Sequence, residues 1–233
     1  MVDALTNDLF AQVKVGIPAG DHHKFKIFEK EGAVIKDVKD QKQYNLLMNY
    51  LLLSPNVDLN LVNKLVNDQG IDVKASGHQK NNAMTLAAQN PMCKMETLKA
   101  LADMGLELNC QCEIQAQVLM HYTNSMKVMD KACITWLIEM GNDIKHSDKN
   151  KMNILHYTML NFNIGVEEIK FLVECGADIN QKMHLDFDLI DLVYNTPTSR
   201  KLDPDYFRCL TLTKWLVENM DIQHFTLQKL VDI

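Results

Sequence analysis

Four glycines recur along the chain at almost constant spacing, and this period restricts the possible folds more than any other feature. They lie at positions 70, 105, 141 and 176, so successive copies are 35, 36 and 35 residues apart. Each glycine is followed by one residue, then an acid, then Val, Leu or Ile. A sustained period of this length is typical of repeat proteins, in which similar units stack on one another. We therefore expect a series of stacked units that share one continuous core.

The residues around each glycine predict two helices per unit. Apolar residues at helical spacing precede three of the glycines: Leu98 and Leu101, Ile134 and Leu137, and Ile169 and Leu172. A glycine directly after such a run is typical of a helix end, where it adopts the left-handed conformation without a steric cost. The next unit starts with a shorter apolar run, in which His121-Tyr122-Thr123 and His156-Tyr157-Thr158 lie 35 residues apart. This pattern predicts an all-α fold of helix, turn, helix and projecting loop.

Two segments of the fourth unit resemble the ankyrin repeat. Asp148 to His156 is similar to the opening of such a repeat, and Glu168 to Asn180 is similar to its second helix and hairpin. The unit departs from the family at Lys151, where the family prefers Gly, and at Asn153-Ile154, where it prefers Thr-Pro. The resemblance implies an ankyrin-repeat solenoid over residues 40–222. The repeats are placed at 40–74, 77–109, 113–145, 148–180 and 183–222. Residues 1–39 are expected to form an N-terminal helical cap, and residues 223–233 a C-terminal capping helix or the start of a missing segment.

Composition and charge bear on the class of partner and on the compartment. The chain has 24 basic and 30 acidic residues, a net charge of −6, and no stripe of Lys or Arg. This argues against nucleic acid, which requires many phosphate contacts, and against a polybasic membrane site. No apolar run approaches the roughly 20 residues needed to cross a bilayer. Six scattered cysteines without a secretory signal predict reduced thiols. We expect a monomer in the cytoplasm, or in a host cytosol if the chain is a secreted effector.

Few residues suggest chemistry. The resemblance implies that His121 and His156 make structural hydrogen bonds to neighbouring loop backbone. The Cys110-x-Cys112 pair lacks the second cluster that zinc sites require. The sequence contains no phosphate-binding glycine loop, no His-Glu-x-x-His and no Gly-x-Ser-x-Gly. We therefore expect no catalytic residue, no cofactor and no metal, and hence no enzyme.

In the ankyrin family, loop tips and the outward side of each first helix line a concave groove that binds partners. Carried over unit by unit, this implies the following partner-binding residues: Tyr44, His78, Gln79, Asn81, Ile114, Gln115, Gln117, Met126, Lys149, Asn150, Met152, Leu185 and Phe187. Exposed apolar members of this set, rimmed by amides, would form a binding hot spot. The alternative is that some of them pack against the adjacent loop.

The resemblance makes a protein–protein interaction scaffold, or adaptor, the expected function. A second hypothesis is the targeting arm of a larger effector or enzyme, thiol-dependent or not, whose catalytic part lies outside this chain. Met and Asn occupy positions that are normally fixed in the repeat. In this respect the chain resembles ankyrin proteins of intracellular bacteria and of large DNA viruses.

Overall fold

The computed structural model describes residues 36, 38–195 and 206–220. Over these residues the chain consists of α-helices joined by loops and short 3-10 turns, and no β-strand occurs in that part of the chain. The expected all-α class is thus confirmed. Nearly all of the predicted cap over 1–39, and the whole of 223–233, lie outside the described residues.

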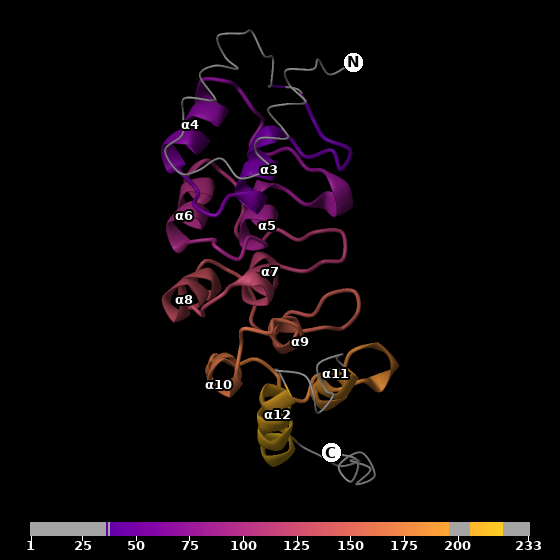
Figure 1. The fold of residues 1–233 in the computed structure, drawn as a ribbon. Coiled ribbons are helices and arrows are strands. Elements are labelled where there is room, and N and C mark those ends of the chain that lie inside the picture. The colour runs from indigo at the N-terminus through magenta and orange to yellow at the C-terminus, as the bar shows by residue number, and fades with distance from the viewer. Residues whose placement is uncertain (1–35, 37, 196–205, 221–233) are drawn as a thin grey trace.

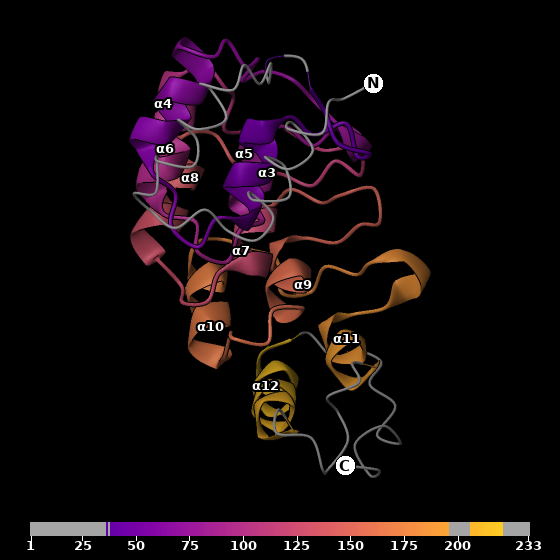
Figure 2. The same ribbon diagram turned by 45° about the horizontal axis from the view of Figure 1, so that its top comes forward.

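The helices follow one another in pairs. The pairs are α3 (Leu46–Leu53) with α4 (Leu59–Asn67), α5 (Ala83–Ala88) with α6 (Met95–Asp103), α7 (Val118–Ser125) with α8 (Lys131–Glu139), α9 (Ile154–Met159) with α10 (Val166–Glu174), and α11 (Leu189–Asn195) with α12 (Tyr206–Asn219). The first helices α3, α5, α7, α9 and α11 pack against one another in that order. Figure 1 shows this row in the middle, with α4, α6, α8 and α10 to its left. The longer loops between pairs all project to the right, and Figure 2 shows the same arrangement from a tilted view.

At three of the first helices, α5, α9 and α11, a capping side chain accepts an N–H of the first turn, and an acceptor three residues later accepts the N–H of the capping residue. At α5 the side chain of Asn82 accepts the Thr85 N–H at 3.0 Å, and the Thr85 hydroxyl accepts the Asn82 N–H at 2.9 Å. At α9 the Asn153 N–H donates to Nδ1 of His156 at 3.2 Å. At α11 a carboxylate oxygen of Asp191 accepts the N–H of Asp188 at 3.3 Å. The arrangement satisfies amides that the first turn of a helix leaves without partners.

The prediction that His121 and His156 occupy the same position of the repeat was wrong. Helix α7 begins after Gln117, whose N–H donates to the sulfur of Met120 at 3.4 Å. Met120 is therefore the counterpart of His156, and His121 lies one residue further along the helix. The two His-Tyr-Thr copies are 35 residues apart, whereas the two helix starts are 36 apart, so the match between the copies was out of register.

Left-handed glycines end the second helices, as predicted. Gly70, Gly105, Gly141 and Gly176 all have positive φ angles. At α8 the Gly141 N–H donates to the carbonyl of Ile138 and the Asn142 N–H donates to that of Leu137, both at 3.0 Å. This pair of bonds closes the helix end and turns the chain into the following loop.

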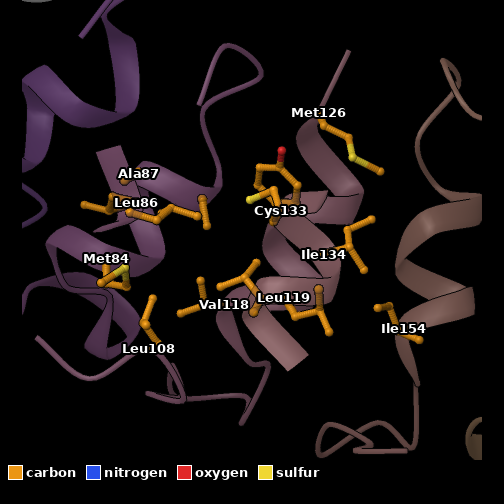
Figure 3. Packing of buried hydrophobic residues seen from close by; sticks show 14 of the residues in the cluster. Met84, Leu86, Ala87, Leu108, Val118, Leu119, Met126, Cys133, Ile134 and Ile154 are labelled. Atoms are coloured by element: carbon orange, nitrogen blue, oxygen red, sulfur yellow. The ribbon is translucent and has the colours of Figure 1, made fainter. Parts of the chain in front are cut away.

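The core is one continuous apolar cluster that runs through all five pairs. Figure 3 shows its middle, where Leu86 and Ile154 lie on either side of Val118, Leu119 and Ile134, so that three successive pairs contribute to one core. All five side chains are buried. Because each pair contributes only one layer of this core, its apolar faces are covered only when the neighbouring pairs are in place.

Buried amide side chains also join consecutive pairs. Asn142 accepts the Leu119 N–H at 3.1 Å and donates to the carbonyls of Leu108 and Leu137 at 3.0 and 3.1 Å. Asn90 and Asn161 each donate to two backbone carbonyls of the preceding pair, at 2.7 to 3.0 Å. Each of these side chains satisfies backbone groups that would otherwise be buried without a partner.

Candidate protein-binding surface

Each loop between helix pairs, and the loop before α3, reverses in a three-residue tip. We number the tips along the chain: residues 41–43, 78–80, 113–115, 149–151 and 184–186 are tips 1 to 5. The residue before each tip donates its N–H to the carbonyl of the residue after it, at 2.9 Å in four tips and 3.3 Å in tip 3. Every tip contains at least one non-glycine residue with positive φ, and in tips 2 and 5 two such residues are adjacent.

The tips are joined to one another by backbone hydrogen bonds. In tips 2 to 5 the first residue donates its N–H to the carbonyl of the middle residue of the preceding tip. The four bonds are His78 to Lys42 (2.8 Å), Glu113 to Gln79 (2.7 Å), Lys149 to Ile114 (2.9 Å) and His184 to Asn150 (3.1 Å). The tips therefore form one continuous row, positioned by the stacked helices behind it.

Most of the predicted partner-binding residues lie on this row and reach solvent. Exposed polar members are His78, Gln79, Gln115, Lys149 and Asn150. Three apolar side chains are also exposed: Leu185 (88%), Phe187 (38%) and Ile114 (36%). These eight predicted residues are accessible to a partner.

Two predicted contact residues, Tyr44 and Asn81, are instead buried beside their tips, and this corrects the sequence analysis. The ring of Tyr44 packs so closely on tip 2 that a Cβ at Gly77 would lie 2.5 Å from it. Burial raises the pKa of the Tyr44 hydroxyl. Asn81 donates to the carbonyl of His78 at 3.2 Å and accepts from Gln89 at 3.1 Å. Both side chains stabilise the tips and are not free for a partner.

Gln117 and Met126 are also buried, and Met126 lies away from the tips. The side-chain oxygen of Gln117 accepts the Asp143 N–H at 3.1 Å, which links one loop to the next. Met126 follows the C-terminal end of α7 and packs into the core, as Figure 3 shows. Its position within the repeat predicted that Met126 lies on the outward side of a first helix. Helix α7 instead ends at Ser125, and the side chain of Met126 is buried.

Met152 is half-buried against a small second cluster formed by Cys112, Ala116, Met120 and Tyr157. Cys112 and Ala116 flank tip 3, whereas Met120 lies in α7 and Tyr157 in α9. For Met152 and Tyr44 the alternative weighed in the sequence analysis, packing against the adjacent loop, is the one that the structure shows.

Tip residues Lys80 and Lys151 were not among the predicted contact residues. Both are exposed, and both occupy the third position of their tips with φ near +60°. An alignment of the units on their helix-capping residues, Asn82 and Asn153, would have placed these lysines at equivalent positions.

His121 and His156 are both buried. His121 is 9% exposed, and its ring meets that of Tyr157 edge-on at 6.3 Å between centroids. His156 is fully buried, and neither Nε2 atom has a hydrogen-bond partner. Burial lowers the pKa of each imidazole to about 4, and Asp148 raises that of His156 slightly against this trend. At neutral pH both rings are therefore uncharged packing groups.

The cysteines also have the environment of packing residues. All six thiols are free, and Cys133 and Cys209 lie within the main core. Burial raises the pKa of Cys93 to about 12 and that of Cys133 to about 11, so neither carries a thiolate at neutral pH. Among the residues that the structure describes, no three His, Cys, Asp or Glu side chains are grouped so as to hold a metal ion.

Comparison with known proteins finds similarity in fold but none in sequence. No protein-family model matches the sequence, and no curated protein matches it. The fold is shared with 456 chains of solved structures. One belongs to the structure "Bd0816 Predatory Endopeptidase from Bdellovibrio bacteriovorus in complex with immunity protein Bd3460", with a TM-score of 0.62 and 15% identity. The match covers 91% of this chain and 97% of the other. At this identity the similarity concerns the fold alone.

The described helices include none that is both long and apolar enough to cross a membrane. The described residues thus present an extended row of tips that backbone hydrogen bonds join to one another.

Proposed function

We propose that this chain is a protein-binding scaffold of about five ankyrin-type repeats, and that the row of tips is its contact surface. The observation that carries the proposal is the chain of backbone hydrogen bonds from tip to tip, together with the exposed Leu185, Phe187 and Ile114. Because the backbone of the row is already ordered, a partner that binds there costs little additional ordering entropy. Large apolar side chains on such a surface are the usual source of binding free energy.

Three observations support the ankyrin assignment. The fourth unit resembles the family over Asp148 to His156 and Glu168 to Asn180. Each helix pair falls within one of the five predicted repeat ranges. His156 takes part in the helix cap at the start of its unit, which agrees with a structural role for this residue.

The solved chain of similar fold comes from a complex between two proteins, which is consistent with a protein partner here.

A catalytic role is not part of the proposal. The protonated state of Cys93 and Cys133 and the neutral state of His121 favour packing over acid–base or nucleophilic chemistry. We also propose that the chain acts as a monomer in the cytoplasm, a reducing compartment that suits its six free cysteines.

The experiment compares two double variants in affinity capture from cytosol. Ile114→Asp with Leu185→Asp places two charges on the row of tips. Met92→Asp with Val128→Asp places two charges in the turns within helix pairs. These control sites are 38% and 81% exposed, close to the 36% and 88% of Ile114 and Leu185. The tip variant should weaken capture by about 2 kcal/mol, or about thirtyfold, because burying an unpaired charge in a contact is costly.

Both double variants should retain the melting temperature of the parent, since all four side chains are exposed. Equal capture by the tip variant and the parent would refute the row of tips as the interface. If instead Cys110→Ala or Cys112→Ala abolished a cellular activity while capture was intact, a thiol-dependent enzyme would replace the scaffold as the better proposal.

A further inference from the structure

Tips 4 and 5 form the part of the row that is richest in exposed lysine and apolar side chains. His184 donates its backbone N–H to the carbonyl of Asn150 at 3.1 Å and its ring Nε2–H to that of Lys149 at 2.9 Å. The side chain of Gln181 donates to the carbonyl of Lys151 at 3.4 Å. The loop of tip 5 thus holds the backbone of tip 4 at three points, and the side chains of both tips are presented as one surface.

Leu185 is the most unusual residue of this surface. Its side chain is 88% exposed and its backbone has a φ of +66°, a conformation that costs free energy in any residue with a Cβ. Folding gains nothing from an apolar side chain that remains in water. A structural role would be served better by Gly or Asn, which adopt this backbone conformation more readily. Both features are explained if Leu185 is buried by a partner.

Three lysines accompany Leu185. Lys149, Lys151 and Lys182 are all exposed, and over the described part of the chain none of them has a carboxylate within ion-pair distance. The chain as a whole carries a net charge of −6. Residues 149–151 and 182–187 contain these three lysines and one acid, Asp186, and the acids that flank them are buried Asp148 and half-buried Asp188. The exposed charge of these two segments is therefore positive, opposite in sign to that of the molecule.

We infer that the tip 4–5 surface, defined as Lys149, Lys151, Lys182, Leu185 and Phe187, binds an acidic segment of a partner protein that inserts a large apolar side chain against Leu185. This inference rests on the proposed scaffold function and adds the chemistry of the partner. Carboxylates of the partner would lie opposite the three lysines, and complementary charge of this kind favours correct encounter and register. The apolar contact would supply most of the affinity.

Protein fits this surface better than nucleic acid does. Binding to a phosphate backbone depends on many cationic contacts, and three lysines next to Asp186 supply few. An aliphatic side chain such as Leu185 contributes nothing to phosphate binding. Exposed bases would stack on aromatic rings, and Phe187 is the only aromatic residue of this surface.

The test is selection of 12-residue peptides from a random phage-displayed library on the full chain, followed by affinity measurement of the enriched peptides by fluorescence anisotropy. We expect enriched peptides with net negative charge and at least one large apolar residue. Their binding should weaken about tenfold or more in Lys149→Glu/Lys151→Glu/Lys182→Glu and about tenfold in Leu185→Ser. It should also weaken as NaCl rises from about 50 to about 500 mM.

The matched control is Lys127→Glu with Val128→Ser, which changes an exposed lysine and an exposed apolar residue in the turn between α7 and α8. This variant should bind the peptides as the parent does. All of these substitutions lie at exposed positions, and circular dichroism should show that each variant keeps its helix content.

The possible failures are distinguishable. Enriched peptides that require the tips but are neutral or basic would overturn the inferred chemistry and leave the scaffold function in place. Peptides that bind the parent, the lysine variant, Leu185→Ser and Ile114→Asp/Leu185→Asp equally would overturn both proposals. Failure to enrich acidic peptides over the starting library would overturn the inference. So would tighter, lysine-dependent binding of a mixed-sequence single-stranded oligonucleotide, which would assign the surface to nucleic acid.

Discussion

Mild acid should destabilise this protein through two buried histidines. His121 and His156 have pKa values of about 4 in the folded chain, against an ordinary value of about 6.5 that the unfolded chain recovers. Between these two values the unfolded state binds protons that the folded state does not. Stability is therefore complete above about pH 6.5 and is lost as the pH falls toward 4. From pH 7 to pH 5 the loss should be about 2 kcal/mol for each histidine, a large part of a typical total stability of about 5–15 kcal/mol.

Other repeats of the chain supply matched variants for this test. Thr85 holds in α5 the capping position that His156 holds in α9, and its hydroxyl accepts the same backbone N–H. Leu86 and Leu192 occupy the position of His121 in their own helices. His156→Thr and His121→Leu thus replace each imidazole with a side chain that a sister unit already uses.

The measurement is the free energy of unfolding in urea at pH 7 and at pH 5, for the parent, both single variants and the double variant. The difference between the two pH values is the quantity compared, so that packing losses at either pH cancel. Each single variant should remove about half of the drop and the double variant nearly all of it. Few carboxylates take up protons above pH 5. If the drop is the same in all four proteins, the buried-neutral state of these histidines is refuted.

Three further predictions concern single positions, each measured by urea unfolding at neutral pH. Gly141→Ala should cost about 1–2 kcal/mol of stability through backbone strain alone, because no atom lies within 4 Å of the added Cβ, and Gly141→Asn should cost less. Equal stability of the parent and both variants would contradict the left-handed cap. Leu172→Ala should cost about 2–5 kcal/mol, since the side chain is fully buried in the shared core, and a melt identical to the parent would place Leu172 outside it. Asn142→Ala should cost about 3 kcal/mol by leaving the Leu119 N–H and two carbonyls buried without partners; a loss below 1 kcal/mol would mean that water replaces the amide.

The sequence predicts the repeated part of this fold well because glycine and buried leucine have narrow physical requirements. The left-handed ends at Gly105 and Gly141, and the helices before them, follow directly from backbone sterics and apolar spacing. The same period located the loops on which Ile114 and Leu185 are exposed.

The failures arise where burial depends on a neighbouring unit. Tyr44 and Met126 look like surface residues in their own units, and only the adjacent loop or helix pair covers them. The spacing of apolar residues within one unit does not show which of its side chains a neighbouring unit buries. The misplacement of His121 has a different cause. The two His-Tyr-Thr sequences were aligned with each other, whereas the register of α7 is set by its capping residue, Gln117.

The helix caps have a consequence for how this chain can change over time. At one position of the repeat Thr85, Met120, His156 and Asp191 all accept the backbone N–H of the residue that begins their helix. The position demands an acceptor atom at a certain place and is indifferent to which residue carries it. Substitution among four chemically unlike residues is then close to neutral, and identity can erode while the backbone path persists. A chain under such weak constraint at this position can lose sequence similarity to its relatives while it keeps its fold.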